Sequence, residues 1–103
     1  RTLARARDIR LLIVLQPNRT MTRSLAWGRT ESPYDAVYGQ AIEGFYDEVL
    51  ADVELVGSIV DGSRIFDRLR TSPWVDFLHV QEDGNRAIAD FVYEELAARG
   101  WLD

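Results

Sequence analysis

The chain has 103 residues, no cysteine and a formal net charge of −5, and apolar residues make up 47% of it. This length allows one small domain with a thin core, and the composition is typical of a globular chain rather than a disordered one. The absence of cysteine excludes a disulfide framework, a thiolate zinc site and a cysteine nucleophile.

Neither a membrane span nor a signal peptide is expected within these residues. The longest apolar run, Leu11–Leu15, is much shorter than the roughly 20 residues that cross a bilayer, and a secreted parent protein would carry its signal elsewhere. Residues 1–30 hold seven arginines and one acid, a net charge of +6, whereas residues 31–103 carry −11. Because the two parts attract each other and the chain as a whole is acidic, we expect no nucleic-acid partner.

The amino-terminal third predicts the end of a helix, a strand and a long loop. Residues 1–7 have the composition of a last helical turn, with arginines where the helix dipole favours cations. Residues 9–16 form an aliphatic run that stops at Pro17-Asn18, which predicts a strand buried on both faces. Residues 17–33 follow as a long irregular segment, and a loop of this length in a compact domain usually has a function.

The rest of the chain predicts a helix, a strand and a second helix. The first helix covers residues 33–51, with proline at its first position and the preceding serine as its cap. A strand over residues 55–60 ends at Asp61-Gly62, where the carboxylate favours a turn role over a catalytic one. The last helix begins at Glu82-Asp83, presents one apolar stripe and ends at Gly100.

The order strand, helix, strand, helix is typical of a parallel sheet built by right-handed crossovers, so we predict an α/β fold. Two parallel strands do not form a stable sheet alone, and a strand as apolar as residues 11–15 needs cover on both faces. We therefore expect residues 1–103 to be the carboxyl-terminal half of a larger α/β domain. The amino-terminal half of that domain is expected in another chain or segment.

His79 is the only histidine, and Asp76 lies three residues before it. A carboxylate at this spacing in a turn reaches the imidazole Nδ1, fixes the tautomer and leaves Nε2 as a general base. Such a pair is two-thirds of a hydrolase triad. The same spacing also fits a surface histidine with a local hydrogen bond to an aspartate.

Residues 75–89, Val-Asp-Phe-Leu-His-Val-Gln-Glu-Asp-Gly-Asn-Arg-Ala-Ile-Ala, resemble the last sequence block of the SGNH, or GDSL, hydrolase superfamily. That block consists of Asp-x-x-His, a short link, Gly-Asn and an apolar helix. Asp76 and His79 match its acid and base, and Gly84-Asn85 match the dipeptide that opens the helix. Gln81 departs from the pattern, because the family often has Ser, Thr or Asn there.

The resemblance implies a three-layer α/β/α, flavodoxin-like domain and a serine ester hydrolase that acts on a small ester. It implies that His79 takes the proton of a serine and that Asp76 orients the imidazole. The family's Gly-Asp-Ser nucleophile block is absent from this chain. The implied partner is therefore a companion chain or segment that carries the serine, and the chain alone is expected to be inactive. No cofactor is expected.

Three aromatic residues are predicted to bind the substrate: Trp27 in the long loop, and Trp74 and Phe77 beside the Asp-His pair. A packing role fits each of them as well. A metal site is not expected, because His79 would be its only nitrogen ligand. Two other interpretations stay open: a non-catalytic α/β interaction module that completes a partner's sheet, and a flavodoxin-like domain that binds a nucleotide or flavin.

Overall fold

The computed structural model describes residues 2–19, 33–74 and 79–102. Five elements follow one another in this part of the chain: α1 (Thr2–Ala6), β1 (Ile13–Leu15), α2 (Pro33–Leu50), β2 (Ile59–Asp61) and α3 (Glu82–Ala98). The fold is mixed α/β, as the order of the predicted elements indicates. None of the helices in the described ranges is both long and apolar enough to span a membrane.

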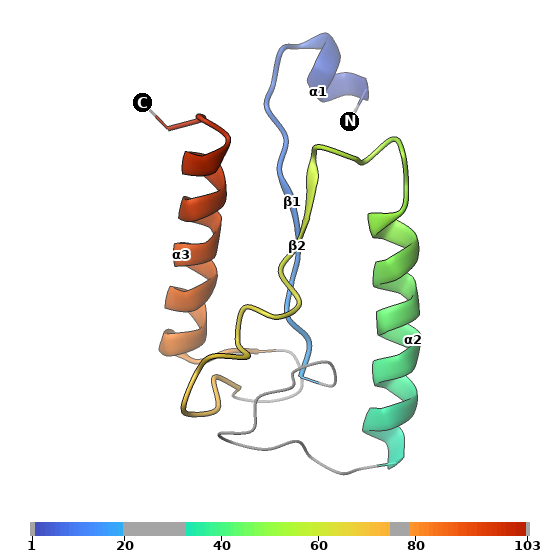
Figure 1. Ribbon diagram of the computed structural model, residues 1–103, viewed down its shortest axis with the longest axis vertical. Coiled ribbons are helices and arrows are strands. Elements are labelled where there is room, and N and C mark those ends of the chain that lie inside the picture. Colours follow the sequence, from blue (N-terminus) through green and yellow to red (C-terminus); the bar gives the residue numbers. More distant parts are fainter. Residues whose placement is uncertain (1, 20–32, 75–78, 103) are drawn as a thin grey trace.

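β1 and β2 form a two-stranded parallel sheet, in which Ile13 lies opposite Ile59 and Leu15 lies opposite Asp61. Helix α2 comes between the two strands in sequence, and the strand pair runs between α2 and α3 in space (Figure 1). Both long helices begin at the end of the molecule where the two strands finish (Figure 1). We call this end the carboxyl end of the sheet.

Both strands are shorter than predicted. β1 takes up three residues of the predicted strand 9–16, and these residues are half-buried rather than buried on both faces. β2 begins at Ile59 instead of Leu55, because the residues between form a turn in which the Ser58 N–H donates to the Leu55 carbonyl at 2.9 Å. Gly57 lies in this turn with a φ of +86°, a left-handed conformation that glycine adopts readily.

The two long helices are confirmed almost to the residue. α2 ends one residue before the predicted end, and α3 begins at Glu82 as predicted. The predicted apolar face of α2 is only partly buried, however, because Tyr38 is 57% exposed and Phe45 is 60% exposed. The side of α2 that carries these rings faces solvent in the described structure.

The core of the described structure is small. Phe66 has no exposed surface and Trp74 is 6% exposed. Their rings meet edge to face, with centroids 5.2 Å apart and ring planes at 81°. Both residues lie between β2 and α3 in the sequence, so this connecting segment supplies the centre of the packing.

Gly62 brings the end of β2 into close contact with β1. Its N–H donates to the Leu15 carbonyl at 2.9 Å. A Cβ atom at this position would lie 2.7 Å from that oxygen and 2.9 Å from Cγ1 of Val14. The approach of the two strands therefore depends on a residue without a side chain.

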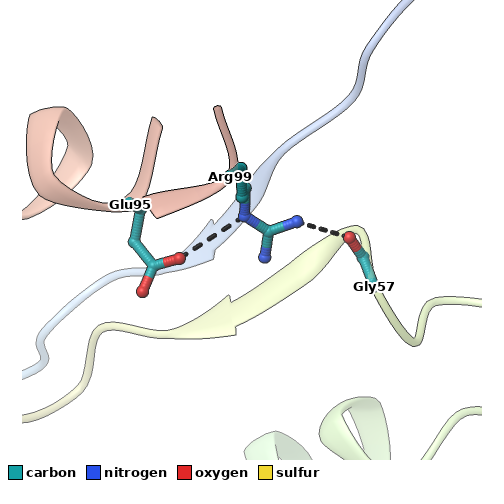
Figure 2. A network of polar contacts seen from close by, with 3 residues as sticks. All are labelled: Gly57, Glu95 and Arg99. Atoms are coloured by element: carbon teal, nitrogen blue, oxygen red, sulfur yellow. Dashed lines mark hydrogen bonds and ion pairs between the residues drawn. The ribbon is translucent and has the colours of Figure 1, made fainter. Parts of the chain in front are cut away.

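Arg99 ties the end of α3 to the turn before β2. Its Nε lies 3.4 Å from the Glu95 carboxylate, and its Nη1 donates to the Gly57 carbonyl at 2.5 Å (Figure 2). The guanidinium carbon of Arg99 lies 5.3 Å from the ring centroid of Trp101, and that of Arg10 lies 5.9 Å from it. These contacts join α3, the turn before β2 and the residues that lead into β1.

Candidate functional site

His79 is exposed and lies three residues before Glu82, the first residue of α3. The amino end of α3 is at the carboxyl end of the sheet (Figure 1). Ligands of open α/β sheets bind outside the carboxyl ends of the strands. His79 therefore lies at the end of the molecule where open α/β sheets have their ligand-binding sites.

The backbone before His79 is joined to the backbone after it. Trp74 and Val80 form an antiparallel bridge. The Gln81 N–H donates to the Pro73 carbonyl at 2.6 Å, and the Gln81 side-chain Nε2 donates to the Trp74 carbonyl at 3.3 Å. His79 is thus adjacent to Val80, whose backbone these contacts hold in place.

Gln81 is the N-cap residue of α3, but its side chain makes no capping hydrogen bond to the helix. The amide instead donates to the Trp74 carbonyl, so Gln81 joins the start of α3 to the segment before His79. Gly84, in the first turn of α3, is buried. A Cβ atom on Gly84 would lie 2.9 Å from Cβ of Val80 and 3.0 Å from Cβ of Pro73. Only glycine allows α3 to start this close to the His79 segment.

Trp74, which we predicted to bind substrate, is a core residue that packs against Phe66. Its indole Nε1 is buried and has no hydrogen-bond acceptor in the described structure. A buried donor without a partner costs about 1–3 kcal/mol, so an acceptor for this N–H would be stabilising. Contact between Trp74 and substrate stays a prediction.

Asp76, Phe77 and Trp27 lie outside the residues that the structure describes. The contact between the Asp76 carboxylate and the His79 imidazole therefore stays a prediction, as do the substrate-binding roles of Phe77 and Trp27. The structure places the other two predicted site residues, His79 and Trp74, on the two sides of one backbone junction next to α3.

A further contact at the carboxyl end of the sheet involves a residue that no sequence pattern marks. The Tyr46 hydroxyl, on α2, donates to the Gln16 carbonyl directly after β1 at 2.6 Å. Burial raises the pKa of Tyr46 above its ordinary value of 10.0, and the negative charge of Asp61 raises it further. A hydrogen bond between residues 30 positions apart leaves no signal in residue spacing, so only the fold reveals it.

Asp61 has the turn role that the sequence predicts. Its Oδ1 accepts a hydrogen bond from the Ser63 N–H at 2.9 Å, which stabilises the turn after β2. Within the described ranges, no three carboxylate or imidazole side chains gather closely enough to hold a metal ion.

Comparisons of the chain with protein-family models, with curated proteins and with solved structures found no match. A function for this chain is therefore inferred from its residues and from their arrangement. Three observations bear on it: the position of His79, the contacts that hold the backbone around it, and the half-buried state of β1.

Proposed function

We propose that residues 1–103 form the carboxyl-terminal part of an SGNH-type serine ester hydrolase and supply its catalytic acid and base. His79 acts as the general base, and Asp76 orients its imidazole. The serine nucleophile and the oxyanion donors belong to a companion chain or segment. The chain on its own is inactive, because it lacks the nucleophile.

The observation that carries this proposal is the position of His79 just before α3, at the end of the molecule where both parallel strands finish. Active sites of open α/β sheets form at this end. The resemblance of residues 75–89 to the family's last block predicts the reaction. The position of His79 supports an active site at this end of the sheet.

The packing around Gly84 supports the same assignment. Because a Cβ atom on Gly84 would collide with Val80 and Pro73, the start of α3 is held close to the His79 segment. A general base works only when its side chain stays within hydrogen-bond reach of the proton that it removes. A backbone held this firmly on one side of His79 meets that requirement better than a loop without contacts.

In the proposed reaction, the serine Oγ of the companion attacks the ester carbonyl carbon while Nε2 of His79 takes the hydroxyl proton. The imidazolium, stabilised by Asp76, gives this proton to the departing alcohol, which leaves an acyl-serine. Water then attacks the acyl-serine by the same route. One ester and one water thus yield one acid and one alcohol, and donors on the companion hold the oxyanion in both steps.

The proposal includes a three-layer α/β/α arrangement for the assembled protein. Helices α2 and α3 lie on opposite sides of the strand pair (Figure 1), which is compatible with helices on both faces of a larger parallel sheet. The companion supplies the other strands of that sheet.

A serine-directed fluorophosphonate probe tests the proposal on the protein expressed from the complete reading frame, together with any polypeptide that co-purifies. We expect the probe to label one serine outside residues 1–103, identified by mass spectrometry of the labelled peptide. His79→Ala should lower the labelling rate by at least about 10³-fold, because the serine loses its base. Asp76→Asn should also lower it.

Arg86→Ala is the matched control. Arg86 lies in the first turns of α3, and its ion pair with Glu82, at 3.1 Å, is exposed. This variant should be labelled at the rate of the unmodified protein. If His79→Ala is labelled at that rate too, and circular dichroism shows that it is folded, the proposal is wrong.

A non-catalytic α/β module that completes a partner's sheet is the second candidate. The half-buried state of β1 favours it, because aliphatic strands of this kind are normally covered on both faces. Both candidates need a companion, and they differ in whether His79 takes part in chemistry. The labelling experiment decides between them.

A further inference from the structure

A small cavity lies at the amino end of the sheet, opposite to the end where His79 lies. It is lined by residues of α1, by the chain that leads into β1 and by Ser58, directly before β2. α1 lies at this end of the molecule, beyond the starts of both strands (Figure 1). The cavity has a volume of about 220 Å³, below the roughly 300–1,000 Å³ of pockets for drug-sized ligands, so it suits a small ion or molecule.

The end of α1 brings two arginines to this cavity. The Ile9 N–H donates to the Ala4 carbonyl at 2.8 Å, and the Asp8 N–H donates to the Arg5 carbonyl at 3.2 Å. These bonds close the helix and turn the chain, with Asp8 in the left-handed region at a φ of 55°. Arg5 and Arg10 therefore line the same cavity although they are five positions apart in the sequence.

The polar groups of the cavity are available to a ligand. In the part of the chain that the structure describes, neither Arg5 nor Arg10 forms an ion pair, although Asp8 lines the same cavity. The backbone N–H and carbonyl of Ser58 are both hydrogen-bonded, at 2.9 and 2.6 Å. The hydroxyl of Ser58 is therefore the group through which this residue can contact a ligand.

The charges of the cavity favour an anion. Its guanidinium groups and the carboxylate of Asp8 give it a net charge of +1. The guanidinium carbon of Arg10 lies 5.9 Å from the ring centroid of Trp101, and this contact restricts where its charge can lie. A planar guanidinium donates to two oxygens of a phosphate or carboxylate at once, so a pair of arginines suits an oxyanion.

We propose that this cavity binds a phosphate group, held by Arg5, Arg10 and the Ser58 hydroxyl. A phosphate monoester carries a charge of about −1.5 to −2 at pH 7 and gains from both guanidinium groups, whereas a carboxylate carries only a single charge. The phosphate belongs either to the free ion or to a small phosphate ester. The site is separate from the proposed hydrolase site and does not depend on the companion serine.

Nuclear magnetic resonance on the assembled protein from the complete reading frame tests the proposal by titration at a constant ionic strength of about 0.15 M. We expect inorganic phosphate to shift the amide signals of Ser58 and Arg10 saturably, with a Kd of about 1 mM or below. Acetate should bind at least about tenfold more weakly. Ethyl phosphate separates the two sources: tighter binding than inorganic phosphate identifies an ester as the ligand, and weaker binding identifies the free ion.

Four variants test the assigned residues. Arg5→Gln and Arg10→Gln should each raise the Kd for inorganic phosphate by at least about tenfold. Asp8→Asn should lower it by about three- to tenfold, because a repelling charge is removed and asparagine also tolerates the left-handed region. A gain in affinity cannot arise from a loss of structure. Arg86→Gln removes one positive charge from α3, at the other end of the sheet, and should leave the Kd unchanged.

Three results would overturn the proposal. The absence of a saturable shift at Ser58 up to about 20 mM inorganic phosphate means that the cavity holds no phosphate. Equal weakening by Arg10→Gln and Arg86→Gln means that phosphate responds only to the net charge of the protein. Acetate that binds as tightly as phosphate means that the cavity does not select a phosphate group.

Discussion

Tyr46 shows how one side chain joins two elements that are distant in the sequence. Its hydroxyl donates to Gln16 across 30 positions, and the carboxylate of Asp61 contributes to the raised pKa of Tyr46. Tyr46 therefore links α2 with the residue after β1, and it lies close enough to Asp61, the last residue of β2, to feel its charge. The helical spacing of α2 marks Tyr46 as one more residue beside an apolar face and gives no indication of this bond.

Tyr46→Phe should lower the free energy of unfolding of the folded protein by about 1 kcal/mol at pH 7, because the Gln16 carbonyl loses its donor. The unfolded chain ionises this phenol near its ordinary pKa of 10.0, below the raised pKa of the folded state. The stabilisation is therefore complete below pH 10 and is lost as the pH rises through the folded-state pKa. Urea unfolding at several pH values measures the difference between the two proteins.

Tyr93→Phe is the control for this series. Tyr93 is 64% exposed, on α3, and its replacement should change the free energy of unfolding by less than about 0.5 kcal/mol. A difference between Tyr46→Phe and the unmodified protein that grows above pH 10 would contradict the assignment.

Replacement by alanine should have opposite effects on stability at two helical glycines. A Cβ atom on Gly84 would meet two neighbouring carbons at about 3 Å, whereas one on Gly44 meets nothing within 4 Å. Gly84→Ala should destabilise the protein by about 1–3 kcal/mol through overpacking. Gly44→Ala should stabilise it by about 0.5–1 kcal/mol, because alanine favours the helix. Thermal unfolding followed by circular dichroism gives both signs, and a gain from Gly84→Ala would show that the start of α3 is not tightly packed.

At the scale of elements, helices could be predicted from the sequence much better than strands. A helix carries its own boundaries, such as the proline that opens α2 and the acids that open α3. The length of a strand depends on the strand that pairs with it, and the pairing of β1 stops at Leu15 because β2 ends opposite it, at Asp61. The sequence 55–58 is apolar enough for a strand, but Gly57 with its positive φ makes it a turn.

Arg99 connects two elements, and its replacement tests how α3 is held. Arg99→Lys should lower the free energy of unfolding by about 1–2 kcal/mol, because lysine cannot bind Glu95 and the Gly57 carbonyl while lying over Trp101. Arg86→Lys, at an exposed ion pair on the same helix, should change it by less than about 0.5 kcal/mol. Equal effects of the two substitutions, measured by urea unfolding, would show that Arg99 contributes only as a surface charge.

At the scale of the whole molecule, the candidate site is predictable only in part. The spacing of Asp76 and His79 predicts a general base, and the order of elements places His79 at the carboxyl end of the sheet. The burial of Trp74 was not predictable, because it depends on its contact with Phe66 and so on how the segment between β2 and α3 folds. Local sequence patterns indicate candidate catalytic residues and helix ends. Burial depends on contacts between residues that are far apart in the sequence.

The molecule is extended rather than spherical. The radius of gyration is 15.3 Å, against about 13 Å for a compact domain of 100 residues. The molecule extends 46 × 29 × 18 Å.

The contact at Gly62 also explains how β1 keeps its alignment with β2. Every residue of β1 is aliphatic, so hydrophobic burial alone does not prevent β1 from shifting by one residue along β2. Such a shift exchanges the two faces of the strand. Sliding in either direction would bring Asp61 or Ser63 against the Leu15 carbonyl, where even a single Cβ atom has no room. The absence of a side chain at Gly62 thus allows only one alignment of β1 with β2. This alignment is selected by steric fit rather than by the polarity of the side chains.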